Sequence, residues 1–133
     1  MSCDYAVWSA EPRLSNAEAG KLYVKLCDGT DRPASLRPNR AVATFYAELT
    51  AKHPEIDDVS EEQLEDKDLC PWSCAFDRAD SYVIMNCIWP KANYVGNLVE
   101  SMAAKHGLAF YDPQSERVKY AGSPSDKPWW KLW

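Results

Sequence analysis

The chain has 133 residues, which suits one domain with a single hydrophobic core. Hydrophobic residues make up 46% of it, and this share excludes global disorder. The formal net charge of −5 argues against nonspecific nucleic-acid binding, because that binding needs a positive surface to replace phosphate counterions. The same charge is compatible with a basic protein partner.

The chain carries no sign of export or of membrane insertion. Its N-terminus, MSCDYAVW, lacks the basic start and apolar run of a secretory signal, and no run approaches the roughly 20 apolar residues of a membrane span. We therefore expect a cytoplasmic protein whose five cysteines are reduced thiols, with Cys87 and Cys3 as small core residues.

The first third of the chain predicts a strand and then a capped helix. Asp4–Trp8 is short, aromatic and β-branched, which favours a strand. Ser15 and Glu18 match a capping box, in which each side chain accepts a hydrogen bond from the other residue's backbone N–H. Gly29 should end this helix in the left-handed conformation. The apolar face of the helix comprises Ala19, Leu22, Tyr23 and Leu26.

A second helix should end near His53, where Pro54 stops it, and an acidic segment follows. The helix carries apolar residues at helical spacing, namely Val42, Phe45, Tyr46 and Leu49. The acidic segment, residues 55–69, has eight acids and one lysine, so it contributes −7 and the rest of the chain sums to +2. We expect a surface excursion with one short helical turn capped by Ser60 and Gln63, anchored by Ile56, Val59 and Leu64.

The stretch from Cys70 to Trp89 is the most apolar part of the protein and predicts a β-hairpin. Residues 72–78 and 82–89 form its two strands. The second strand is apolar on both faces, so it should be central in its sheet. Tyr82, Ile84 and Ile88 should face one way, and Val83, Met85, Cys87 and Trp89 the other. Asn86 is the exception and needs a hydrogen-bond partner.

A third long helix and a last strand complete the predicted elements. The helix follows Pro90 and ends at His106–Gly107, and its buried stripe comprises Val95, Leu98, Val99 and Met102. Leu108–Tyr111 forms the last strand, and residues 114–127 are polar and expected to be loosely held.

The element order β-α-α-β-β-α-β predicts an α+β, ferredoxin-like fold. A four-stranded antiparallel sheet would carry its helices on one face, and right-handed crossovers would place the first strand and the strand over residues 82–89 together at the centre. We assign residues 1–118 to one domain and residues 119–133 to a Trp-rich tail. This tail either folds back over the open sheet face, which we favour, or contacts a membrane interface or a partner.

Several motifs resemble those of a widespread group of small bacterial proteins. They are a first strand ending in Trp8, the HPEIDD run of residues 53–58, the CPWS run of residues 70–73, and HGLxxYDPQ over residues 106–114. The resemblance covers roughly residues 4 to 118. The group has no assigned activity, and its motifs carry no known chemistry. Proteins of this kind are found as accessory or immunity-type partners of bacterial toxins.

The sequence offers no strong catalytic or metal-binding constellation. Cys70 and Cys74 are separated by three residues, whereas redox motifs and zinc knuckles use two, so we expect no cofactor and keep a metal or redox site as the less favoured alternative. His53 and His106 each end a predicted helix, where a histidine is favoured as a C-terminal cap. The sharper alternative pairs His53 with the nearby acids as a general base, but no nucleophile stands beside it. An enzyme is therefore disfavoured and left open.

Our first functional hypothesis is a non-enzymatic inhibitor of the immunity type, which binds a basic toxin through its carboxylates. The predicted contact residues are Asp57, Asp58, Glu61, Glu62, Glu65, Asp66, Asp68 and Trp72. The alternative for the acidic residues is an ordinary solvated face.

The second hypothesis is a small-molecule-binding or enzymatic domain with a pocket on the sheet face near Trp8, Trp72 and Trp89. Such a domain would form a homodimer around its ligand. Asp112 and Gln114 either end the last strand in an Asx turn, which we favour, or belong to a binding loop at the sheet end.

Overall fold

The computed structural model describes residues 2–10, 13–29 and 36–120, and the Trp-rich tail lies outside the described residues except for its first two. The described chain forms an α+β fold with a five-stranded antiparallel sheet in the order β2-β3-β1-β4-β5. The strands are β1 (Ser2–Trp8), β2 (Asp77–Arg78), β3 (Tyr82–Ile88), β4 (Ala109–Asp112) and β5 (Arg117–Lys119). The helices are α1 (Asn16–Asp28), α2 (Arg40–Lys52), α3 (Glu61–Glu65) and α4 (Ala92–Lys105), with two short 3₁₀ turns, η1 (Ile56–Asp58) and η2 (Trp89–Lys91).

The centre of the sheet is the long pairing of β1 with β3. It joins every residue of β1 to a partner in β3, from Ser2 with Ile88 to Trp8 with Tyr82. The prediction that these two strands lie together at the centre is confirmed. β4 pairs with the other edge of β1, and β2 pairs with β3. The remaining strand, β5, pairs with β4.

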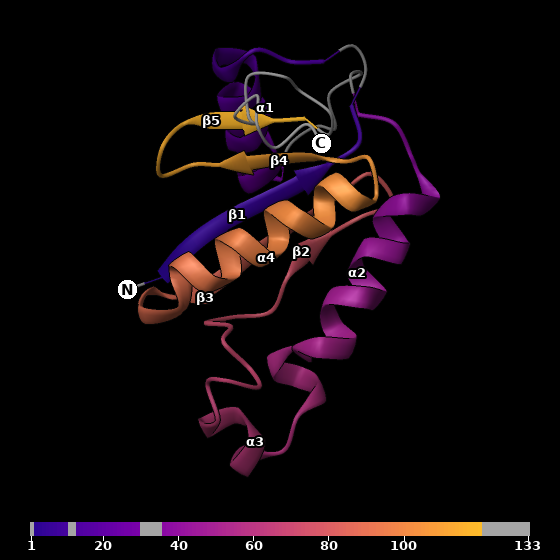
Figure 1. Cartoon of the computed structure of the whole chain (residues 1–133). Coiled ribbons are helices and arrows are strands. Elements are labelled where there is room, and N and C mark those ends of the chain that lie inside the picture. The colour runs from indigo at the N-terminus through magenta and orange to yellow at the C-terminus, as the bar shows by residue number, and fades with distance from the viewer. Residues whose placement is uncertain (1, 11–12, 30–35, 121–133) are drawn as a thin grey trace, which may run out of the picture.

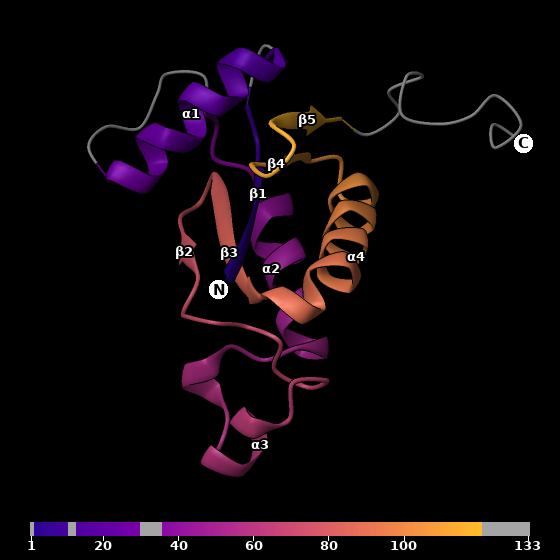
Figure 2. The same cartoon turned by 90° about the vertical axis from the view of Figure 1, so that its left-hand side faces the viewer.

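Helices cover both faces of the sheet, so the prediction of helices on one face is wrong (Figure 2). α2 and α4 pack on one face, over alternate strand residues such as Val7, Val83 and Met85. α1 packs on the opposite face through Ala19, Leu22 and Leu26, over Ala6, Trp8, Tyr82, Ile84 and Tyr111. The alternation predicted for β3 is confirmed for residues 82–87, because Tyr82 and Ile84 pack on the α1 face and Val83, Met85 and Cys87 on the other. Ile88 belongs to neither buried cluster.

The helix boundaries follow the expected chemistry. Both predicted capping boxes form, Ser15 with Glu18 and Ser60 with Gln63. Gly29 adopts the left-handed conformation with φ of 67° and ends α1 as predicted. Among the described residues, no helix is long and apolar enough to span a membrane.

The predicted hairpin is only partly formed. β3 matches its second strand up to Ile88. Trp89 instead begins the helical turn η2, with Pro90 as its second residue, and it is 54% exposed. The first strand shrinks to two residues. Trp72 makes one isolated bridge to Cys87, and the backbone N–H of Phe76 turns away from β3 to bond a side chain.

The C-terminal end of the described chain contains a strand that the sequence analysis missed. We expected residues 114–127 to be loosely held, but β5 pairs with β4 across three residues. Polar side chains stabilise this strand. The Asn16 side chain accepts a hydrogen bond from the Val118 N–H at 2.9 Å, and the Tyr120 hydroxyl donates to the Leu14 carbonyl at 3.0 Å. The prediction of a four-stranded sheet therefore missed one edge strand, β5.

Candidate binding surfaces

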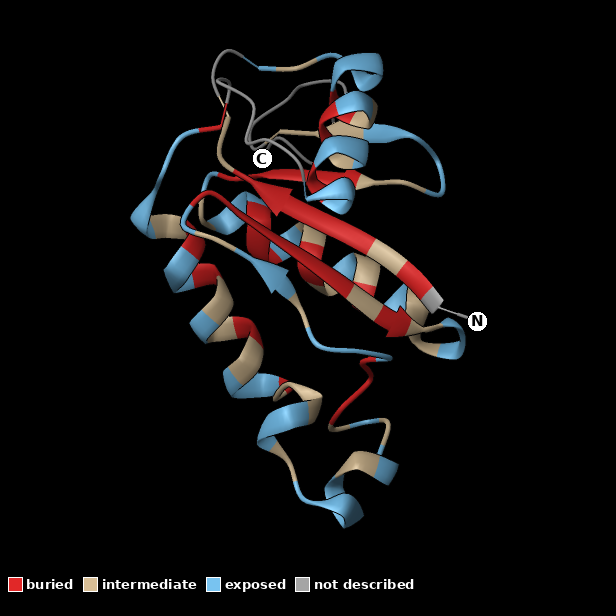
Figure 3. Ribbon diagram, turned by 180° about the vertical axis from the view of Figure 1, so that it is seen from behind, coloured by how far each residue is buried: buried red, intermediate tan, exposed pale blue. Residues whose placement is uncertain are grey.

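The acidic segment, residues 55–69, projects from one end of the molecule as two short turns, η1 and α3 (Figure 1). All seven predicted acidic contact residues are exposed, and seen from behind the segment is mostly exposed or half-exposed (Figure 3). The exposed carboxylates are those of Asp57, Asp58, Glu61, Glu62, Glu65, Asp66 and Asp68. Of these seven carboxylates, only that of Asp68 forms an ion pair within the described part of the chain, with Lys91. The other six carboxylates form no ion pair with any residue that the structure describes.

The underside of the acidic segment is attached to the core. Ile56, Val59 and Leu64 are partly buried against the hydrophobic cluster under α2 and α4, as predicted for the three anchors. The Lys67 ammonium donates to the Leu64 carbonyl at 2.8 Å and closes the turn after α3. This attachment holds the carboxylates on a defined surface, so they do not form a free acidic loop.

His53 attaches the acidic segment to the helices α2 and α4. Its imidazole is 4% exposed and bonds through both nitrogens, Nδ1 to the Leu69 carbonyl at 2.9 Å and Nε2 to the Tyr94 hydroxyl at 2.8 Å. A carbonyl oxygen only accepts, so Nδ1 carries the proton and, in the neutral ring, Nε2 accepts from the Tyr94 hydroxyl. His53 thus ties the end of α2 to the end of the acidic segment and to α4. Because both nitrogens are engaged, the geometry gives no support to the alternative of a general base.

Two further side chains, those of Trp72 and Glu55, also hold the acidic segment against the core. Trp72 is 1% exposed, and its indole N–H donates to the His53 carbonyl at 2.9 Å. The Glu55 carboxylate accepts from the Phe76 N–H at 2.8 Å and from the Tyr46 hydroxyl. Trp72 therefore does not lie on the acidic surface. The sequence analysis grouped Trp72 with the seven exposed carboxylates as a contact residue, but its indole is buried in the core beneath them.

The three tryptophans expected around one sheet-face pocket lie in three different environments. Trp8 is buried under α1, Trp72 is buried on the opposite face with α2 and α4, and Trp89 is largely exposed on η2. The prediction of a pocket lined by all three tryptophans is therefore wrong. The buried indole nitrogen of Trp8 has no hydrogen-bond partner among the described residues.

Asp112 and Gln114 form the favoured Asx turn, with the Gln114 N–H donating to the Asp112 carboxylate at 2.9 Å. The Gln114 side chain also replaces a missing backbone pairing. The β1–β4 register would set Asp4 opposite Pro113, which has no N–H to donate. Instead the Gln114 amide donates to the Asp4 carbonyl at 2.9 Å and accepts from the Asp4 N–H at 3.2 Å. These bonds give both residues a structural role.

The remaining polar candidates also serve the fold. The His106 ring contacts the Glu48 carboxylate at 3.0 Å, and this carboxylate also binds Lys105 at 3.0 Å. Asn86 finds the partner it was expected to need, because its amide donates to the Asp4 carboxylate and accepts from the Cys74 thiol at 3.1 Å. Cys70 is buried whereas Cys74 is exposed.

The thiols on β1 and β3 are core residues, as predicted. Cys3 and Cys87 are cross-strand neighbours and both are buried. Burial raises the pKa of the Cys87 thiol to about 12, and it raises the pKa of Cys3 as well. Both groups are therefore protonated at neutral pH and unsuited to nucleophilic chemistry.

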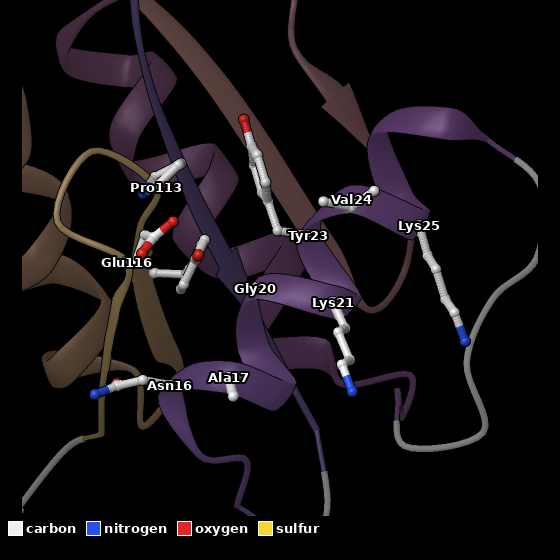
Figure 4. Close-up of a pocket in the computed structure, with 10 residues that line it drawn as sticks. Asn16, Ala17, Gly20, Lys21, Tyr23, Val24, Lys25, Pro113 and Glu116 are labelled. Atoms are coloured by element: carbon white, nitrogen blue, oxygen red, sulfur yellow. The ribbon is translucent and has the colours of Figure 1, made fainter.

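One hollow in the described surface was not foreseen. It is a groove of about 860 Å³ between α1 and the β4–β5 hairpin (Figure 4). Its α1 side comprises Asn16, Ala17, Gly20, Lys21, Tyr23, Val24 and Lys25, and its hairpin side comprises Tyr111, Pro113 and Glu116. The volume falls in the range of roughly 300–1,000 Å³ that is usual for small-molecule sites. The groove forms because α1 lies beside the β4–β5 hairpin. The sequence analysis predicted neither the position of α1 on this face nor the strand β5.

Comparison of the chain with protein-family models, with curated proteins and with solved structures found no match.

Proposed function

We propose that this protein is a non-enzymatic binding protein of the bacterial cytoplasm that neutralises a basic protein toxin, as an immunity-type inhibitor does. One observation carries the proposal: six exposed carboxylates without an ion-pair partner in the described chain stand on a protruding segment that is fastened to the core. The resemblance of the HPEIDD and CPWS runs to small bacterial proteins of this kind points in the same direction.

The physical support is the combination of charge and rigidity. Carboxylates accept several hydrogen bonds and pair with lysine and arginine, so a concentrated set attracts a basic surface and speeds its association. Ordering a loop on binding costs free energy, whereas this segment is already held by His53, Trp72 and Glu55. A prearranged acidic surface therefore loses less of its interaction energy on binding.

The test is charge reversal on α3 with a control of equal charge change elsewhere. Glu62→Lys with Glu65→Lys should weaken binding of the partner at least tenfold, since each reversal replaces attraction by repulsion. Both positions are exposed, so the fold should persist. The control is Asp28→Lys with Glu116→Lys, two exposed acids outside the acidic segment. Equal losses in both double variants would show that net charge, not this surface, governs binding.

The second candidate function is small-molecule binding, which the groove beside α1 favours. It keeps the idea of a pocket next to the sheet but moves it away from Trp72 and Trp89. The groove lies on the α1 face, whereas α2 and α4 cover the other face. The two candidate functions therefore use separate surfaces and can be tested separately.

We also infer that the fold is an elaborated ferredoxin-like arrangement. The strand order β2-β3-β1-β4 together with α2 and α4 on one face corresponds to the predicted split pattern. On this interpretation α1 and β5 are the additions. A solved structure with the same core but without these two elements would support the inference.

A further inference from the structure

The floor of the groove is an aromatic side chain whose hydroxyl is available. Tyr111 is 3% exposed; its ring stacks on Trp8 and meets Tyr23 at a tilt, with ring centroids 5.4 Å away in each case. Its hydroxyl makes no hydrogen bond to any residue in the described part of the chain, although the side chain lines the groove. A polar atom at the bottom of a mainly apolar hollow is a specific point of attachment for a ligand.

Tyr111 is suited to donate this hydrogen bond. Burial raises its pKa above the usual tyrosine value, and the neighbouring Glu116 and Asp112 carboxylates add to the rise. The phenol is therefore neutral over the physiological range and carries its proton. A hydrogen-bond acceptor on a ligand would be the matching group.

Gly20 keeps the hydroxyl accessible. A Cβ at this position would lie 3.2 Å from the Tyr111 hydroxyl oxygen, so any side chain would crowd it. Glycine inside a helix costs about 1 kcal/mol relative to alanine. The absence of a side chain at Gly20 therefore keeps the Tyr111 hydroxyl uncrowded, and it lowers the stability of α1.

The charged groups around the groove favour an anion. Lys21 and Lys25, one turn apart on α1, line one side, and neither is within ion-pair distance of a carboxylate in the described chain (Figure 4). Glu116 alone faces them from the hairpin side. Two ammonium groups and a phenol supply donors, whereas the apolar contacts come from Val24, Pro113 and the ring of Tyr23.

We propose that this groove binds a small molecule with a planar apolar body and one anionic group, the body lying against Val24 and Pro113 above the Tyr111 hydroxyl and the anion meeting Lys21 and Lys25. This proposal rests on the second candidate function and names its ligand class. The two lysines select charge, and the open position at Gly20 admits the planar body.

The experiment is an NMR titration of the full chain with two probes of equal shape and opposite charge, 2-naphthoate and 2-naphthylmethylammonium. We expect the naphthoate to shift the amide signals of Ala17, Gly20 and Val24 and to bind at least tenfold more tightly than the cation. Equal affinities for the two probes would overturn the anion preference and leave small-molecule binding standing. Failure of both probes to bind would overturn the preference and the second candidate function together.

Variants locate the interaction. Lys21→Gln with Lys25→Gln should weaken naphthoate binding about tenfold, and Tyr111→Phe should weaken it about fivefold, without a change in the fold. Lys52→Gln, an exposed lysine on α2, is the matched control and should leave affinity unchanged. If the control weakened binding as much as the groove variants, the binding would not be located at this groove.

Discussion

Replacing His53 by alanine should loosen the acidic segment and destabilise the whole domain. The change removes the bonds to the Leu69 carbonyl and the Tyr94 hydroxyl, each contributing about 1 kcal/mol net. It also leaves a cavity where a ring that is 4% exposed had packed, at a cost of roughly 1–2 kcal/mol. The free energy of unfolding should therefore fall by about 3 kcal/mol.

Two milder variants separate the contributions. His53→Asn keeps an N–H that can reach the Leu69 carbonyl, so it should recover about half of the loss. Tyr94→Phe removes only the hydroxyl partner, and because Tyr94 is 44% exposed, water can replace it on His53 at a cost below about 1 kcal/mol.

Urea unfolding followed by circular dichroism measures these differences, provided that the dependence on urea stays the same for all variants. A loss below about 1 kcal/mol for His53→Ala would refute the reasoning, because it would mean that the two bonds and the packing contribute nothing. A loss for Tyr94→Phe equal to that for His53→Ala would also contradict it.

Two further predictions concern α4 and its C-terminal end. Gly96→Ala should destabilise the domain by about 1–3 kcal/mol, because its Cβ would lie 2.7 Å from the Tyr5 hydroxyl oxygen, and adding Tyr5→Phe should restore part of the loss in thermal unfolding. Hydrogen bonds from Lys105 and then His106 hold the pKa of Glu48 below its usual value, so its contribution is present at neutral pH and is lost as pH falls through the folded pKa. Glu48→Gln should therefore lower the melting temperature at pH 7 and have no effect near pH 2, and an equal effect at both values would contradict this.

Local chemistry in the sequence predicted the individual elements well. The capping boxes at Ser15 and Ser60 gave the starts of α1 and α3, because they depend only on residues three apart. The period-two pattern of residues 82–88 gave the two faces of β3. The charge of residues 55–69 gave their exposure, since unpaired carboxylates are costly to bury.

Long-range placement was harder to predict. α1 and α2 have similar apolar stripes, and nothing local states that they cover opposite faces of the sheet. β5 has three residues with one apolar side chain, Val118, so its pattern is too short to recognise. Its stability comes partly from Asn16, about 100 positions away.

The motif residues were misjudged for a related reason. The sequence placed Trp72 next to the acids, and this proximity suggested a shared surface. In the fold its indole turns inward to the His53 carbonyl. In the sequence, only the neighbouring Pro71 indicated a fixed loop at this position; the bridge from Trp72 to Cys87 that holds the indole inside becomes visible only in the fold.

The central claim is that the acidic segment binds a basic protein, and co-expression with the proteins encoded beside this one tests it most directly. Native mass spectrometry of the purified chain should show a complex of defined stoichiometry with one basic protein. The complex should be lost with Glu62→Lys and Glu65→Lys and kept with Asp28→Lys and Glu116→Lys. A chain that elutes alone, or a complex that tolerates reversal on α3, would contradict the account.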